Sequence, residues 1–362
     1  MRNTRISLVI ITSILICLGV VMIYSTSSIY AWQKLGDPAY FLKRHILYIM
    51  LGTILTLLIM SIDYRLLQRH AKSIMLISLF LLILVLIPGV GREISGARRW
   101  FRFFGLSFQP AEFAQLAMII YVASFLSREN KNIKDFYSGF LPVITVLGIF
   151  TILILVQPDL GMSVALVTIA FFMLFVGGIR LAHLGAIALL SLPVLYLLIY
   201  RVPYRLSRIV SFWDPWKDPK GSGFQLIQSQ LALGSGGMLG VGLGRGMQKL
   251  FYLPAAHTDF IFSIIGEELG LIGTLSVVVL FILFIWLASK IAMNATDSFG
   301  HYLGIGITAV IAFEAIVNIG VSTGTLPTKG LPLPFISYGG TSLVLDMISV
   351  GLLLNISKSK DV

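Results

Sequence analysis

Long apolar runs without charge limit this chain to very few folds. Residues 73–90 read SIMLISLFLLILVLIPGV, and another apolar run extends from residue 6 to 23 after a short basic N-terminus. A helix crosses a bilayer with about 20 apolar residues, whereas strands of membrane β-barrels show about 10 residues of alternating polarity. Composition agrees, because 57% of the residues are hydrophobic and only 12% are charged, against about 25% charged in soluble domains. We therefore predict an all-α, polytopic transmembrane helical bundle.

Ten apolar runs predict a single integral membrane domain over residues 1–362. The predicted spans are 6–28, 45–62, 73–90, 110–127, 138–157, 160–178, 184–201, 261–289, 302–325 and 341–357. The first run is interpreted as an uncleaved helix and not as a signal peptide, because further spans follow it. An even number of spans places both termini on one side. Basic residues of the short loops predominate there, which predicts cytoplasmic termini and makes residues 202–260 a long extracytoplasmic loop.

The outer loops are predicted to be basic, in a chain whose formal net charge is +11. Such a face fits either anionic lipid headgroups or a polyanionic ligand that is handled there. In the segment Gly96-Ala97-Arg98-Arg99-Trp100, the paired guanidiniums either bind lipid phosphate or anchor the loop at the headgroup level.

The long loop ends in a glycine-rich segment that leads to His257, Thr258 and Asp259 at the start of an apolar span. Seven glycines between residues 234 and 246 allow the backbone to approach a ligand closely or to bend sharply. Asp259 is the candidate base, because partial desolvation at the membrane boundary raises the pKa of a carboxyl group. The alternative is a helix N-cap formed by Thr258 or Asp259. His257 is either an orienting partner for Asp259 or an interfacial polar residue.

Other acidic residues fall at or within membrane depth, where a charge at the centre of a span costs about 2.5–3.5 kcal/mol. They are Glu112, Asp159, Glu267, Glu268, Glu314 and Asp346. We expect the last two to face the bundle interior or a wet cavity. Glu112 and Asp159 have a second interpretation, as residues that complement or cap a helix N-terminus.

A proline-rich outer loop occupies residues 327–341. Its prolines stiffen the backbone. The loop either connects two helices or holds Lys329 and Ser337 over a site.

Several motifs, in order along almost the whole chain, resemble the SEDS family (shape, elongation, division and sporulation), and its FtsW/SpoVE branch more than RodA. They are GARRW at 96–100, QPAE at 109–112, QPDLG at 157–161, GFQ at 223–225 with Gln228 and Ser229, LP at 253–254 with HTDFIF at 257–262, GEELG at 266–270 and KGLPLPFISYGGT at 329–341.

The resemblance implies a glycosyltransferase that polymerises lipid II into peptidoglycan strands at the outer face of the bacterial cytoplasmic membrane, in cell division and at the septum. Asp259 matches the family's essential aspartate and would act as general base for the acceptor hydroxyl, with inversion at the donor sugar. The resemblance and the loop patterns together predict these substrate-binding residues: Arg98, Arg99, Glu112, Asp159, Gln225, Ser229, Lys249, His257, Thr258, Lys329 and Ser337.

The same chemistry requires Arg, Lys or a divalent cation such as Mg²⁺ or Mn²⁺ to neutralise the departing pyrophosphate, and the sequence does not identify metal ligands. The implied partners are lipid II, the growing glycan strand, a class B penicillin-binding transpeptidase, other divisome membrane proteins and membrane lipids, and no nucleic acid is expected.

Four positions depart from the family pattern. Gln115 replaces a lysine, Ala255 a glutamate and His45 a glutamine, while Asp346 is an additional acid. Two other functions remain open. Buried charges also suit a lipid II flippase, and a degenerate relative would act only as a divisome scaffold.

Overall fold

The computed structural model describes residues 1–94, 96–103, 105–128, 135–250 and 252–358, so Phe251 of the predicted long loop lies outside it. Twelve α-helices lie within these ranges. Their bounds are α1 Arg2–Leu35, α2 Tyr40–Ser61, α3 Arg65–Leu84, α4 Pro110–Leu126, α5 Leu141–Val156, α6 Leu160–Val176, α7 Leu181–Tyr200, α8 Pro203–Trp213, α9 Phe224–Gly236, α10 Ile261–Met293, α11 Ser298–Thr323 and α12 Gly340–Lys358. A π-helical turn, Phe136–Phe140, precedes α5, and a 3₁₀ turn, Pro215–Lys217, follows α8.

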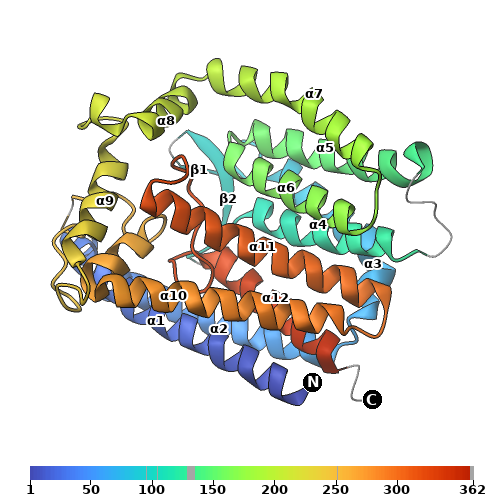
Figure 1. Cartoon of the computed structure of the whole chain (residues 1–362), viewed down its shortest axis with the longest axis horizontal. Coiled ribbons are helices and arrows are strands. Elements are labelled where there is room, and N and C mark those ends of the chain that lie inside the picture. The colour runs from blue at the N-terminus through green and yellow to red at the C-terminus, as the bar shows by residue number, and fades with distance from the viewer. Residues whose placement is uncertain (95, 104, 129–134, 251, 359–362) are drawn as a thin grey trace.

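The prediction of a polytopic bundle is confirmed. Eight helical segments, the π-turn counted with α5, are long and apolar enough to cross a membrane, and the apolar helices α4 and α6 are shorter. Together they correspond to the ten predicted spans. The third span begins at Arg65 instead of residue 73, because basic side chains can extend to the water while their helix continues beyond the apolar layer. Both termini lie at one end of the bundle (Figure 1), as an even number of spans requires.

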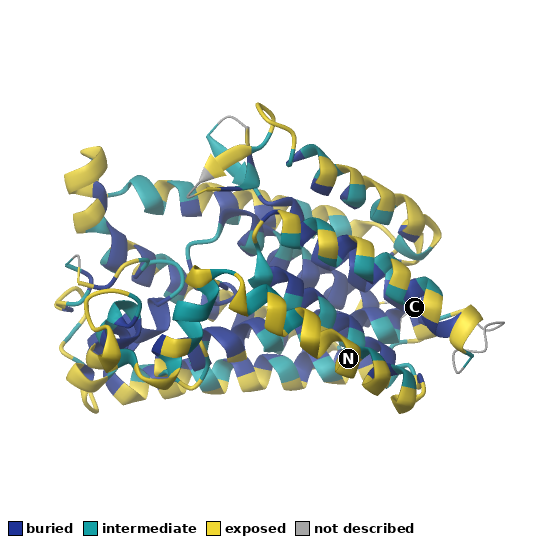
Figure 2. Ribbon diagram, turned by 90° about the horizontal axis from the view of Figure 1, so that it is seen from above, coloured by how far each residue is buried: buried dark blue, intermediate teal, exposed yellow. Residues whose placement is uncertain are grey.

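The helices form a central group surrounded by a peripheral layer. Most residues of α4 and α12 are buried, and so are many of α11. In contrast, α7 buries only Leu184 among its residues. Figure 2 shows the buried residues at the middle of the bundle and the exposed ones on the outward faces of the outer helices. Many exposed side chains are large and apolar, which is the surface that lipid tails solvate.

The end of the bundle opposite the termini carries structure that the sequence did not predict. A small antiparallel sheet in the order β1-β2-β3 comprises Arg92–Ile94, Ala97–Phe103 and Leu106–Phe108. The predicted long loop contains α8 and α9. All of these elements lie at the same end of the molecule (Figure 1), so the outer segments gather around one mouth of the bundle.

Helix α10 is interrupted at Gly270, whose φ of 68° and ψ of −163° are not helical. The glycine-rich loop fills the break, since Val241 N–H donates to Glu267 O at 2.9 Å and Leu271 N–H donates to Gly237 O at 2.9 Å. A Cβ on Gly270 would lie 2.4 Å from the Gly240 nitrogen. Glycine at this position therefore permits the backbone contact that fixes the first turns of α10, directly after Asp259.

Candidate active site

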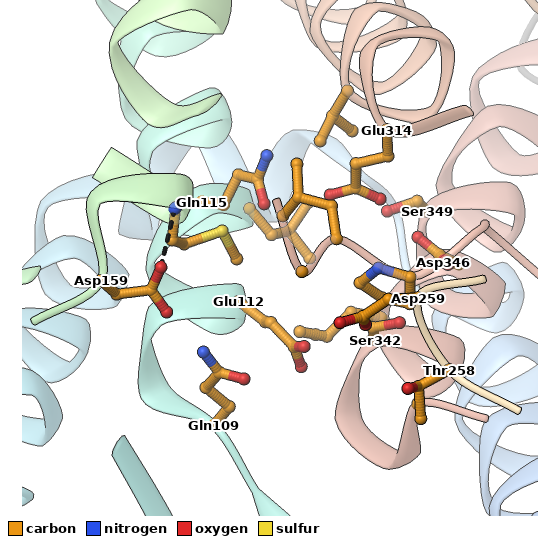
Figure 3. Close-up of a pocket in the computed structure, with 18 of the residues that line it drawn as sticks. Gln109, Glu112, Gln115, Asp159, Thr258, Asp259, Glu314, Ser342, Asp346 and Ser349 are labelled. Atoms are coloured by element: carbon orange, nitrogen blue, oxygen red, sulfur yellow. Dashed lines mark hydrogen bonds between the residues drawn. The ribbon is translucent and has the colours of Figure 1, made fainter. Parts of the chain in front are cut away.

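A cavity of about 220 Å³ opens between the central helices and two outer loops. It brings together polar residues from the three helices α4, α11 and α12 and from loop segments distant in sequence (Figure 3). Its polar lining residues are Gln109, Glu112, Gln115, Asp159, Thr258, Asp259, Glu314, Tyr338, Ser342, Asp346 and Ser349, with Trp100 of β2. The predicted residues Glu112, Asp159, Thr258 and Asp259 thus share one cavity.

Asp259 does not cap helix α10. The N-cap residue is Phe260, and no side chain caps the helix, so the cap interpretation of Asp259 was wrong. Burial raises the pKa of the Asp259 carboxyl group, while the positive charge of Arg208 and a hydrogen bond from Thr258 oppose that rise. A Cβ on Gly330 would lie 2.9 Å from Asp259 Oδ2. The carboxylate therefore has room because residue 330 has no side chain.

The loop that carries Asp259 is bonded to the proline-rich loop. Asn318 of α11 donates from Nδ2 to Asp259 O at 3.0 Å and to Leu331 O at 2.8 Å. Ser337 donates from Oγ to Thr258 O at 2.6 Å. Ser337 is therefore near the site, where it orients the backbone. The sequence analysis did not single out Asn318, although a polar amide within an apolar span is itself a signal of a buried polar contact.

Asp159 and Lys329 lie beside each other at the edge of the site. Asp159 caps α6 by accepting from Met162 N–H at 3.0 Å, as its alternative interpretation predicted, and it lies 3.3 Å from Arg99 Nη1. Burial lowers the pKa of Lys329 to about 8, and the charges of Asp159 and Glu314 oppose that effect. Arg99 also donates to Gln157 O at 2.8 Å and to Pro158 O at 2.6 Å, so its guanidinium holds the turn before α6.

The inner wall of the cavity is acidic. Glu112, Glu314 and Asp346 all line it, and the last two are nearly inaccessible. Within the described structure, Glu112 Oε2, Asp346 Oδ2 and Gln115 Nε2 are buried without a hydrogen-bond partner. Buried polar atoms are normally satisfied by protein, water or ligand. The departures at Gln115 and Asp346 therefore both fall in this cavity.

His257 packs in an aromatic cluster next to Asp259. Its ring centroid lies 4.7 Å from that of Phe41, 5.9 Å from Tyr338 and 6.1 Å from Tyr30. Burial lowers its pKa to about 4, so the ring is neutral near pH 7. The backbone oxygen of His257 accepts from Tyr338 N–H at 2.9 Å, which adds another bond between the two loops.

Eight predicted substrate-binding residues are absent from the cavity lining as far as the described residues show: Arg98, Arg99, Gln225, Ser229, Lys249, His257, Lys329 and Ser337. Of these, Arg99, His257, Lys329 and Ser337 adjoin residues that do line it. Arg98 donates to Glu93 at 3.1 Å. Ser229 of α9 is buried against Ser263 and Ser322. The Lys249 ammonium lies 2.6 Å from Glu268 Oε1, in a buried ion pair.

The donor set does not fit a protein-held metal. Within the described residues, no three His, Cys, Asp or Glu side chains are grouped so that they could hold one.

A family model described as cell cycle protein, that of FtsW, RodA and SpoVE, matches residues 5–362. The chain belongs to this family. A probable peptidoglycan glycosyltransferase FtsW from Geobacter sp. (strain M18) is 46% identical over 344 residues, covering 95% of this chain and 94% of the relative. Stage V sporulation protein E from Bacillus subtilis (strain 168) is 45% identical over 351 residues, covering 97% and 96%.

Solved structures of the family have the same architecture. One of them is a chain from a solved structure described as structural coordination of polymerization and crosslinking by a peptidoglycan synthase complex. It superimposes on this chain with a TM-score of 0.80 at 32% identity, covering 97% of both chains. Thermus thermophilus rod shape determining protein RodA gives a TM-score of 0.71 at 28% identity, covering 97% of this chain and 96% of RodA.

Proposed function

We propose that this FtsW/RodA/SpoVE family member is a peptidoglycan glycosyltransferase that polymerises lipid II at the outer face of the bacterial cytoplasmic membrane, with cytoplasmic termini and a role in division at the septum. The observation that carries the proposal is the Asp259 carboxylate, half-buried in a polar cavity at the mouth of the bundle and lying against Gly330. Relatives that carry the glycosyltransferase name align over nearly the whole chain.

In the proposed reaction Asp259 acts as general base. Its carboxylate accepts the proton of the 4-hydroxyl group of the acceptor N-acetylglucosamine while that oxygen attacks the anomeric carbon of the donor N-acetylmuramic acid. The bond from that carbon to the lipid pyrophosphate breaks, and the configuration inverts. A positioned base contributes about 10²–10⁴ in rate. Burial supports this role, because it raises the pKa of Asp259 towards the working pH.

The proposal includes a partner that cross-links the new strand, a class B penicillin-binding transpeptidase. It is supported by the likeness to a chain from a peptidoglycan synthase complex. Other divisome membrane proteins and membrane lipids are the remaining proposed partners, and lipid II and the growing strand occupy the site.

The test is polymerisation of pure lipid II by the purified protein, with and without a transpeptidase and with and without EDTA. We expect Asp259→Asn to lower the rate by about 10²-fold or more while lipid II binding persists. Asp218→Asn is the matched control, because it removes an exposed carboxylate of the same long loop and should leave the rate unchanged. Full polymerase activity in Asp259→Asn would refute the assignment.

A flippase is the second candidate, favoured by the placement of Glu314 and Asp346 inside spans and on the cavity wall. Transbilayer movement of labelled lipid II that depends on either residue, without polymer, would establish it. For a scaffold, neither assay would respond while binding to the transpeptidase remained intact.

A further inference from the structure

Arg208 is a basic residue of α8 whose side chain reaches back to the site. Its Nη1 donates to Thr328 O at 3.2 Å. Its guanidinium also lies 4.5 Å above the ring centroid of Tyr204, one turn earlier, and donates to the Tyr204 hydroxyl. Thr328 is two residues before Gly330, which contacts the Asp259 carboxylate. The geometry thus places the guanidinium beside the segment that closes over the candidate base.

The positive charge of Arg208 counteracts the rise in the Asp259 pKa that burial causes. Other charges face the same space. Glu112, Asp159, Glu314 and Asp346 line the cavity, and the charge of Lys329 interacts with Asp159 and Glu314. Four acids therefore line the cavity, and the two cations, Arg208 of α8 and Lys329 of the proline-rich loop, belong to the outer segments.

Neighbouring arginines are engaged by other groups. Arg99 binds two backbone oxygens and Asp159, Arg98 pairs with Glu93, and Arg205 donates to Leu198 O at 3.0 Å. Arg208 uses two of its five N–H donors within the described structure. Its planar fork can still bind an anion through two parallel hydrogen bonds.

Helix α8 also has the features of a helix at the membrane interface. It is a short amphipathic helix directly after the membrane-spanning α7, and Tyr204 and Trp213 are strongly exposed on it. Helices of this kind lie at the boundary between headgroups and lipid tails. A pyrophosphate attached to a membrane-embedded tail is held at that same level.

We propose that Arg208 binds the pyrophosphate of the lipid-linked donor, an inference that rests on the proposed glycosyltransferase function. When the bond from the anomeric carbon to the phosphate oxygen breaks, its electron pair stays on that oxygen. Arg208 neutralises this charge, while the acceptor oxygen bonds to the carbon and its proton passes to Asp259. Because guanidinium stays protonated at all working pH values, Arg208 also keeps Asp259 ionised to lower pH than burial alone would allow.

The test compares Arg208→Gln and Arg208→Lys with Arg205→Gln, a control on the same helix. Two quantities are measured for each purified variant, namely the pH dependence of kcat/KM for lipid II polymerisation and the binding preference for a polyprenyl pyrophosphate over the matching monophosphate. The second needs no turnover. The binding measurement therefore separates failure of this inference from failure of the proposed function. If the proposed function were wrong, the wild-type protein itself would make no polymer.

For Arg208→Gln we expect kcat/KM to fall by about 10²-fold and the pyrophosphate preference to be lost. Without the cation the pKa of Asp259 rises, so activity is lost at a higher pH as the solution is acidified. Arg208→Lys should keep the wild-type acid limb, because it keeps the charge. Arg205→Gln should match the wild type. An Arg208→Gln variant with an unchanged acid limb and unchanged pyrophosphate preference would overturn the proposal, even if its activity fell through a structural effect.

Discussion

Replacing Lys249 by methionine separates a structural role for this residue from the substrate-binding role that the sequence suggested. The Lys249 ammonium lies 2.6 Å from Glu268 Oε1, and the two side chains are 3% and 0% exposed. Lys249 also donates to Ser25 Oγ of α1 at 2.9 Å, and Glu268 accepts from Gly244 N–H at 3.1 Å. The pair therefore joins α1, the glycine-rich loop and α10.

Removing only the lysine leaves the Glu268 carboxylate buried without its cation. Loss of one partner of a buried ion pair costs about 3–5 kcal/mol. At about 2 °C per kcal/mol for a large chain, Lys249→Met should lower the Tm by roughly 6–10 °C. The double variant Lys249→Met/Glu268→Gln removes both charges, so it should recover much of this loss, because replacing a whole buried pair is often close to neutral.

The measurement is thermal unfolding of the purified protein in detergent, followed by intrinsic fluorescence, together with lipid II binding. Lys290→Met, at the other end of α10 and exposed, is the matched control and should leave the Tm within about 1 °C, as surface substitutions usually do. If Lys249→Met kept the wild-type Tm and weakened only lipid II binding, the ion pair would not stabilise the fold and the substrate-binding prediction would stand.

Three further changes test the contacts and charges around Asp259. Asn318→Leu leaves the carbonyls of Asp259 and Leu331 without their donor, so the free energy of unfolding should fall by about 1–3 kcal/mol in a denaturation series, and an unchanged value would show that these bonds do not matter. Gly330→Ala puts a Cβ 2.9 Å from Asp259 Oδ2; displacement of the base should lower kcat by about 10²-fold with lipid II binding retained, whereas wild-type kcat would contradict the tight contact. The pKa of Lys329 is lowered to about 8, so its positive charge is present below that pH and lost above it. Polymerisation that depends on this charge should decline as pH rises through about 8, and Lys329→Arg should abolish the decline; an unchanged decline would assign it to another group.

The sequence alone determined that the chain lies in a lipid bilayer and that its fold is a helical bundle. Each apolar run had to become a helix, because a backbone in lipid must satisfy its own hydrogen bonds, and this holds whatever the neighbours are. The same reasoning placed Asp259 at a membrane boundary and Glu314 and Asp346 towards an interior or a cavity. The small sheet was not predictable, since it lies outside the apolar layer, where hydrophobic periodicity gives little information.

Only the tertiary structure decided which polar residue does what. Lys249 and Lys329 both looked like basic outer-loop residues, yet one is buried against Glu268 and the other lies beside Asp159. The partners concerned are far apart in the chain: 224 positions separate Lys249 from Ser25. Periodicity and spacing describe neighbours within a helix or a turn, whereas the energy of a buried charge is set by whichever distant group the packing of helices brings within hydrogen-bond reach. For that reason the sequence could name Asp259, but not Asn318 and Arg208, which hold and tune it.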